Sequence, residues 1–208
     1  TISVEPPRNP AQMDRAIKGI VEGRYKWIVF TSVNAVRAVW NKIEQLGLDA
    51  RDFAGVHLAA VGTKTAAAIQ EKGISPEVMP KPYKQNAEGL VEVFPNYVEE
   101  IDAVGRVLLP RADIAGDTLV EGLEDLGWEV DDIVAYRTVR AAPPAAETRD
   151  MIKSGGFDAV AFTSGSTARN LVGIAGKPHP RTIIACIGPS TKKVAEEMGL
   201  RVDVVPEQ

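Results

Sequence analysis

The chain contains 208 residues, enough for two compact α/β domains of roughly 100 residues each or for one larger domain. Hydrophobic residues make up 45% of the sequence and charged residues 25%, and the formal net charge is −4. This composition disfavours a disordered chain and a basic nucleic-acid-binding face. No apolar stretch approaches the roughly 18 residues that a membrane-spanning helix requires, so the sequence predicts a soluble protein with a sizeable core.

The few cysteine and histidine residues limit the chemistry available to the chain. Cys186 is the only cysteine, which excludes an internal disulfide and a thiolate metal cluster and favours a reducing, cytoplasmic compartment. His57 and His179 are far apart in the sequence, so a histidine metal site is not expected, and neither has an evident acid–base partner. The first residue is Thr1 rather than methionine and no signal peptide follows, which indicates an interior piece of a longer polypeptide.

Short apolar strands alternate with amphipathic helices along the whole chain, a pattern typical of parallel sheets covered by helices. The first predicted helix opens at Asn9-Pro10, because asparagine caps helices and proline fits their first turn. Later helices carry apolar residues at helical spacing and close at Gly47, Gly127 and Gly199. The strands expected in chain order span residues 27–30, 57–61, 77–79, 106–109, 129–136, 159–162, 183–187 and 203–205.

An internal repeat links the two halves of the chain. Phe30-Thr31-Ser32 followed by Arg37 matches Phe162-Thr163-Ser164 followed by Arg169, each after an apolar strand and at the start of a helix. A second match runs without a gap and pairs residues 59–65 with 185–191, Gly73 with Gly199, Val78 with Val204 and Pro80 with Pro206. The repeat predicts two related α/β domains with parallel sheets.

The repeat also sets the expected domain limits. Residues 8–136 form the first domain and residues 145–208 the second, joined by extended linkers at residues 1–7 and 137–144. Segment 106–136 reads as strand–helix–strand and has no counterpart in the second half. The second domain is therefore expected to lack an N-terminal βα unit, about 30 residues long.

Each repeated motif places a turn rich in Gly, Ser and Thr between an apolar strand and a helix. Such turns lie at the carboxyl edge of a parallel sheet, where open α/β folds bind ligands. Free backbone N–H groups at helix starts attract anions by about 0.3–1 kcal/mol each, although serine and threonine there are also ordinary helix caps. Two such edges facing each other across a hinge would form a cleft for a ligand with many negative groups. The turns are Thr31-Ser32, 62–65, Pro110-Arg111, 163–167 and 188–191.

Other side chains have both a chemical and an ordinary interpretation. Tyr136 ends an apolar strand, where its phenol could donate a proton to a leaving group or simply rest in water. Lys64 and Arg111 fall in the predicted edge turns and could pair with ligand carboxylates or be solvated surface charges. No GxxxxGK[ST] or GxGxxG spacing is present, which disfavours nucleotide binding. Core positions are expected for Trp27, Trp40 and Trp128.

Six motifs follow one another along the chain: Val29-Phe30-Thr31-Ser32, Ala60-Val61-Gly62-Thr63-Lys64-Thr65, Leu108-Leu109-Pro110-Arg111, Val134-Ala135-Tyr136-Arg137-Thr138, Phe162-Thr163-Ser164-Gly165-Ser166 and Ile187-Gly188-Pro189-Ser190-Thr191. Their order and spacing resemble those of the uroporphyrinogen-III synthase family over nearly the whole chain. The resemblance implies two α/β domains joined by a two-stranded linker with a cleft between them, the first domain being built from both chain ends. Here the opening strand and helix of that domain are absent, as is the helix that would follow Pro206.

The resemblance implies a cyclising lyase that needs no cofactor. The family's substrate is hydroxymethylbilane, a linear tetrapyrrole with eight carboxylates, which closes to a macrocycle with its terminal D ring inverted. Loss of the hydroxyl as water gives an electrophilic azafulvene, which attacks the substituted carbon of ring D and forms a spiro intermediate that fragments and recloses. A cleft between mobile domains would hold the ring ends together, which is catalysis by proximity.

Site residues follow from the resemblance by position. Tyr136 matches the family tyrosine that assists departure of the hydroxyl, and no metal is expected. Single substitutions should lower the rate modestly, with Tyr136→Phe the largest. The residues expected to contact the substrate are Thr31, Ser32, Gly62, Lys64, Thr65, Arg111, Ser164, Ser166, Gly188, Ser190 and Thr191.

Two other functions stay open from the sequence. One is a non-catalytic regulatory domain of a larger protein that senses tetrapyrroles or other anions. The other is a two-domain receptor for small ligands, which is usually secreted, whereas this chain shows no export signal. For the synthase, the expected partners are hydroxymethylbilane and a fused or upstream tetrapyrrole-pathway domain, with no nucleic acid, no membrane and a monomeric chain.

Overall fold

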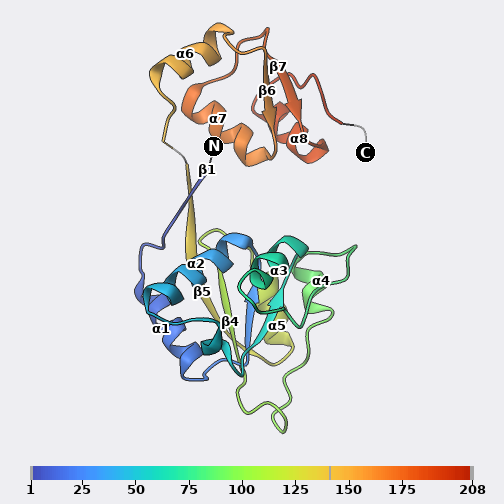
Figure 1. The fold of residues 1–208 in the computed structure, drawn as a ribbon. Coiled ribbons are helices and arrows are strands. Elements are labelled where there is room, and N and C mark those ends of the chain that lie inside the picture. Colours follow the sequence, from blue (N-terminus) through green and yellow to red (C-terminus); the bar gives the residue numbers. More distant parts are fainter. Residues whose placement is uncertain (1, 141, 207–208) are drawn as a thin grey trace. The chain divides into compact units, whose positions relative to one another are not determined.

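The computed structural model describes residues 2–140 and 142–206 of the chain (Figure 1). Residue 1 of the predicted linker 1–7, residue 141 of the linker 137–144 and residues 207–208 of the predicted second domain lie outside the described residues. The chain divides into a first unit, Val4–Thr138, and a second unit, Thr1–Ser3 with Val139–Gln208. This division assigns residues of both predicted linkers to the two units, while the domain limits 8–136 and 145–208 stay a prediction.

The larger sheet has five strands in the order β1-β5-β4-β2-β3, of which β2, β3 and β4 lie wholly in the first unit. Strand β2 pairs in parallel with β3 on one side and with β4 on the other, and β4 pairs in parallel with β5. These pairs have the parallel arrangement that the alternation of strands and helices predicts. The strands are β1 Ile2–Glu5, β2 Trp27–Phe30, β3 His57–Ala60, β4 Arg106–Ala112 and β5 Glu129–Arg140.

Helices cover both faces of this sheet. Successive strand residues point to opposite sides, and because both sides carry apolar residues, both faces pack against helices. Ile28 and Phe30 belong to a core with α1, α2 and α3, whereas Val29 belongs to a second core with α4 and α5. The helices are α1 Ala11–Val21, α2 Val33–Gln45, α3 Thr63–Gln70, α4 Ala87–Val91 and α5 Thr118–Asp125. All three tryptophans are buried as predicted: Trp27, Trp40 and Trp128. The parallel sheet covered by helices, predicted from the sequence, is thus confirmed.

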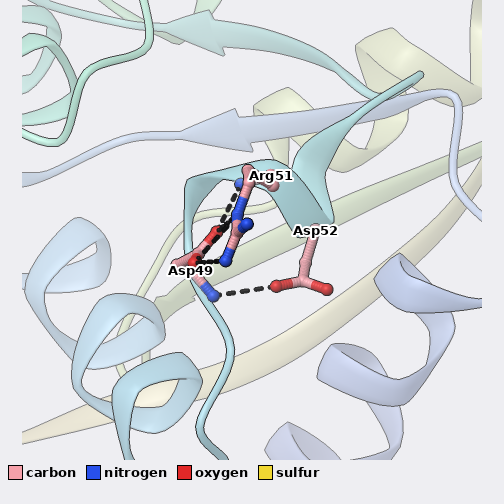
Figure 2. Close-up of polar contacts among 3 residues, drawn as sticks. All are labelled: Asp49, Arg51 and Asp52. Carbon is pink, nitrogen blue, oxygen red and sulfur yellow. Dashed lines mark hydrogen bonds and ion pairs between the residues drawn. The ribbon is translucent and has the colours of Figure 1, made fainter.

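A short turn, η1 (Ala50–Phe53), links α2 to β3 and is closed by reciprocal caps (Figure 2). The Asp49 carboxylate accepts from the Arg51 backbone N–H at 2.9 Å, and the Asp49 N–H donates to the Asp52 carboxylate at 2.8 Å. Hydrogen bonds from the Arg51 side chain lower the pKa of Asp49 to about 2. This turn delivers the chain to the start of β3.

The second unit repeats the middle of the first with fewer strands. Its sheet pairs β6 (Ala159–Phe162) in parallel with β7 (Ile183–Cys186). Ile184 and Cys186 are buried, whereas Ile183 is 46% exposed, so only one face of these strands packs into a core. The helices of this unit are α6 Ala146–Ser154, α7 Gly165–Ala175 and α8 Pro189–Glu197. Each helix that the structure describes, in either unit, is too short or too polar to cross a bilayer.

The predicted repeat is confirmed down to single hydrogen bonds. The Val61 N–H donates to the Phe30 carbonyl at 3.0 Å, and the Ile187 N–H donates to the Phe162 carbonyl at 3.0 Å. Beyond these pairs, the chain returns to form a one-residue parallel bridge in each unit, Ala59 with Val78 and Ala185 with Val204. The two units therefore share a βαβ plan.

Several predicted strand limits are wrong, for a physical reason in each case. Segments 77–79 and 203–205 are single bridges rather than strands, because only Val78 and Val204 pair. Strand β4 continues to Ala112, although the predicted strand stops before Pro110. Proline is tolerated there because β2 pairs with β4 only at Val107 and Leu108, which leaves β5 as the single neighbour of Pro110.

Candidate active site

Two helix starts gather at one edge of the first-unit sheet. Ser32 follows β2 and caps α2, where its Oγ accepts a hydrogen bond from the Ala35 N–H at 3.1 Å. Gly62 follows β3 and is the cap residue of α3, which has no side-chain cap. Because β2 and β3 are parallel neighbours, both helix starts lie at the carboxyl edge, as predicted.

Tyr136 reaches the same edge from β5. Its side chain is 9% exposed, and its hydroxyl lies 3.1 Å from Ser32 Oγ. Ser32 Oγ already accepts from Ala35, so its own hydrogen is free to be donated to the tyrosine oxygen. The Tyr136 hydroxyl is therefore bound to Ser32 rather than to solvent alone, and its role as a proton donor stays a prediction.

Thr65 and Thr191 occupy the same place in the two units, as the third residue of α3 and of α8. They are 5% and 6% exposed, and neither hydroxyl has a hydrogen-bond partner among the described residues. In the described part of the chain, the one fully buried side-chain polar atom without a partner is Nε of Arg149. Both threonine hydroxyls therefore keep access to solvent, which leaves them available to a ligand.

The second unit brings together a matching group of hydroxyls. Ser164 caps α7, accepting from the Thr167 N–H at 3.3 Å, and its Oγ lies 3.0 Å from Ser166 Oγ. Gly188 is the cap residue of α8, and the exposed Ser190 follows in its first turn. The residues predicted from the repeat thus lie at the carboxyl ends of β6 and β7.

In the first unit, the remaining turn residues are open to solvent to different degrees. Thr31 is half-buried directly before Ser32. Lys64 is exposed in the first turn of α3 and has no ion-pair partner among the described residues. Its ammonium group is free to pair with an anion.

Arg111 does not lie in an edge turn, which corrects the sequence prediction. It is a residue of β4, is 7% exposed, and forms a bidentate pair with Asp132 through Nε at 2.7 Å and Nη2 at 2.5 Å. Its Nη1 donates to the Gly116 carbonyl. Hydrogen bonding to Asp132 raises the pKa of Arg111 further. The guanidinium is thus engaged within the fold.

His57 also differs from expectation, because it has an acid–base partner. Its Nδ1 lies 2.6 Å from Glu77 Oε2. The sequence does not reveal this pair, since the chain brings Glu77 back beside β3 only through the bridge at Val78. His57 is the first residue of β3, so the pair lies at the amino end of the strand, away from Ser32 and Gly62.

A cavity of about 410 Å³ in the first unit includes Tyr136 in its wall. Residues that sequence reasoning did not assign to a site complete this wall, among them Asn34, Arg37 and Asn41 of α2. The sequence signal that could identify Arg37 is its recurrence as Arg169 in the repeat. Within residues 2–140 and 142–206, no group of three or more His, Cys, Asp or Glu residues is arranged to hold a metal ion.

Comparison with known proteins then decides the family. The model of the family described as "Uroporphyrinogen-III synthase HemD" matches residues 1–208. The chain belongs to the uroporphyrinogen-III synthase family. Enzymes of this family are cyclising lyases of tetrapyrrole biosynthesis, as the order of the motifs predicts.

Individual members of the synthase family agree. The chain is 35% identical over 196 residues to a Methanothermobacter thermautotrophicus protein provisionally named a uroporphyrinogen-III synthase, covering 87% of this chain and 72% of that protein. It is 28% identical over 195 residues to the uroporphyrinogen-III synthase of Chlorobaculum parvum, covering 88% and 74%. A crystal structure of a mutant synthase from Thermus thermophilus aligns with a TM-score of 0.61 at 20% identity, covering 99% of this chain and 81% of that one, and confirms the fold.

Proposed function

We propose that Tyr136 is the proton donor when this synthase-family chain acts on hydroxymethylbilane, the substrate that the family implies. The contact between Tyr136 Oη and Ser32 Oγ, 3.1 Å long, carries the proposal. It fixes a phenol at the sheet edge where the helix starts gather, and no other tyrosine of the described chain forms a hydrogen bond to a residue of that edge.

The chemistry follows from the two hydroxyl groups. Tyr136 gives its proton to the substrate's hydroxyl, the carbon–oxygen bond breaks, and water leaves while the pyrrole nitrogen lone pair supplies the electrons, which forms an azafulvenium cation beside a tyrosinate. Loss of the pyrrole N–H proton to solvent gives the azafulvene, and the tyrosinate regains a proton from solvent. Ser32 donates its hydrogen to the tyrosine oxygen, so the negative charge that grows on the phenol meets a prepared donor.

The helix starts are proposed to hold the substrate's carboxylates. In each unit, two helices begin directly after β-strands and carry free backbone N–H groups in their first turns. Thr65 and Thr191 add hydroxyls without partners of their own among the described residues, and Ser166 and Ser190 add further donors. Neutral donors of this kind suit a substrate whose carboxylates are spread around a flexible chain.

The test incubates the protein with hydroxymethylbilane and separates the I and III isomers of the product. The wild type is expected to form isomer III. Tyr136→Phe keeps the ring and loses the proton, so kcat should fall about 10- to 100-fold with KM nearly unchanged. Tyr25→Phe is the matched control, because it removes a buried hydroxyl bonded to Asp131 at 2.7 Å in the same unit and should leave kcat unchanged.

Two outcomes would contradict the proposal. A Tyr136→Phe variant with the kcat of the wild type would remove the proton donor from the mechanism. Formation of isomer I alone, at the spontaneous rate, would reject catalysis and favour the regulatory domain that binds tetrapyrroles. A monomeric state, a cytoplasmic location and a fused tetrapyrrole-pathway domain remain proposals beside this one.

A further inference from the structure

The cavity beside Tyr136 has one polar wall and one proline-rich wall. Chain from Pro6 to Pro10 forms one side, and Ala135 with Tyr136 of β5 forms another. The opposite side is a stripe along α2 whose members recur every three or four residues and so share one helix face. The stripe consists of Asn34, Arg37, Ala38, Asn41, Lys42 and Gln45.

This stripe is polar although the neighbouring face of α2 is not. Val36, Val39 and Ile43 on that neighbouring face are almost fully buried against the sheet. Core packing therefore does not require the polar residues of the stripe. Their side chains line open space in the cavity instead.

The charged groups around the cavity are neutralised with one exception. Lys42 Nζ lies 2.5 Å from the Asp14 carboxylate, and the Glu5 carboxylate lies 2.8 Å from Arg137 Nη2. Arg37 is exposed and has neither an ion-pair nor a hydrogen-bond partner in the part of the chain that the structure describes. The cavity therefore presents one uncompensated positive charge.

We propose that Arg37 binds a carboxylate of the substrate in this cavity. This inference rests on the proposed function, because it takes the ligand to be hydroxymethylbilane. The guanidinium offers two parallel N–H donors to a carboxylate, and the amides of Asn34 and Asn41 add neutral donors on the same face. A pyrrole ring anchored here by its acid side chain lies in the cavity that Tyr136 lines, next to the proton donor.

The kinetic test replaces Arg37. Arg37→Gln should raise KM for hydroxymethylbilane about tenfold and leave kcat within about twofold, because a contact made equally in the ground and transition states is lost. Arg37→Lys should recover part of the loss, since lysine keeps the charge without the fork. The thermal unfolding midpoint of Arg37→Gln should match the wild type, because Arg37 has no partner among the described residues.

The charge control is Lys18→Gln. Lys18 is on α1 with its side chain 72% exposed, so this change removes the same charge from a surface position outside the cavity. Its KM should stay at the wild-type value. A KM increase equal to that of Arg37→Gln would assign the effect to net charge and overturn the subsite.

A binding measurement separates this inference from the proposed function. Uroporphyrin III, the stable oxidised form of the product, is titrated by fluorescence, and Arg37→Gln should weaken its Kd about tenfold. If the wild type makes isomer III but Arg37→Gln keeps the wild-type KM and Kd, the subsite is wrong. If the wild type makes only isomer I, the proposed function fails, and the subsite then stands or falls on whether the porphyrin's Kd depends on Arg37.

Discussion

For Arg111, the sequence motif predicts a contact with the substrate, whereas the structure shows an ion pair within the fold. Its motif places it among the substrate contacts, but its guanidinium is bound on three sides, by both oxygens of Asp132 and by the Gly116 carbonyl. The Arg111 side chain is 9% exposed and that of Asp132 is 39% exposed, so the pair is only partly shielded from water. A structural role for Arg111 follows, joining β4 to β5.

A substitution decides between the two roles. Arg111→Met should lower the free energy of unfolding by about 1–3 kcal/mol, less than for a fully buried pair because Asp132 regains water. KM for hydroxymethylbilane should stay within about twofold of the wild type, as urea unfolding and initial rates would measure. Arg51→Met is the matched control, since Arg51 makes a bidentate pair with Asp49 at the surface and should cost little (Figure 2). A raised KM with an unchanged free energy of unfolding would show that Arg111 contacts the substrate and would contradict the structural role.

At the scale of whole elements, α2 combines three tasks along one helix. Its apolar face packs on the sheet, its polar stripe lines the cavity, and its cap residue Ser32 contacts Tyr136. Helical spacing in the sequence predicts the apolar face, and the Thr-Ser turn predicts the cap. The contact of Ser32 with Tyr136 joins residues 104 positions apart, so no local pattern could predict it.

Strand limits that depend on the local sequence can be predicted, whereas limits that depend on pairing with distant segments cannot. The sequence predicts residues 27–30 and 159–162 correctly, because each is a short apolar run bounded by turn residues. It places the end of β4 too early, since the tolerance for Pro110 depends on where β2 stops pairing. The sequence also cannot show which basic residue of α2 is left unpaired. Only the structure shows that Lys42 pairs with Asp14 of α1, whereas Arg37 has no partner among the described residues.

The helix cap and the tyrosine contact can be separated by experiment. Ser32→Ala should cost about 1 kcal/mol of stability through the lost cap and should also lower kcat about 3- to 10-fold. Asn86→Ala removes a comparable cap from α4, where Asn86 accepts from the Gly89 N–H at 2.8 Å, and should leave kcat unchanged. In the Tyr136→Phe background, Ser32→Ala should lower kcat little further, because both act through one proton. Independent, multiplicative losses would show that Ser32 does not act through Tyr136.

The whole molecule consists of two units with a shared plan and unequal cores. The first unit buries side chains on both faces of its sheet, in clusters centred on Phe30 and on Val29. Among the described residues of the second unit there is one cluster of six buried residues, and Ile183 and Ile187 are 46% and 61% exposed. Since apolar burial supplies most of the folding free energy, the second unit is expected to be the less stable.

The chain carries natural reporters for each unit. Trp27, Trp40 and Trp128 all lie in the first unit, whereas Cys186 is buried in the core of the second. Burial raises the pKa of the Cys186 thiol, so the folded unit should resist alkylation. In a urea series, iodoacetamide labelling of Cys186 should rise at a midpoint at least about 0.5 M below the change in tryptophan fluorescence.

Labelling in high urea gives the intrinsic reactivity of the thiol and serves as the control. Phe162→Ala, in the small core, should move the labelling midpoint to lower urea while leaving the fluorescence midpoint in place, because the loss of a buried aromatic side chain falls on the second unit alone. Coincident midpoints in the wild type, moving together in Phe162→Ala, would mean that the two units unfold as one cooperative body, and the inequality of their cores would then have no consequence for stability.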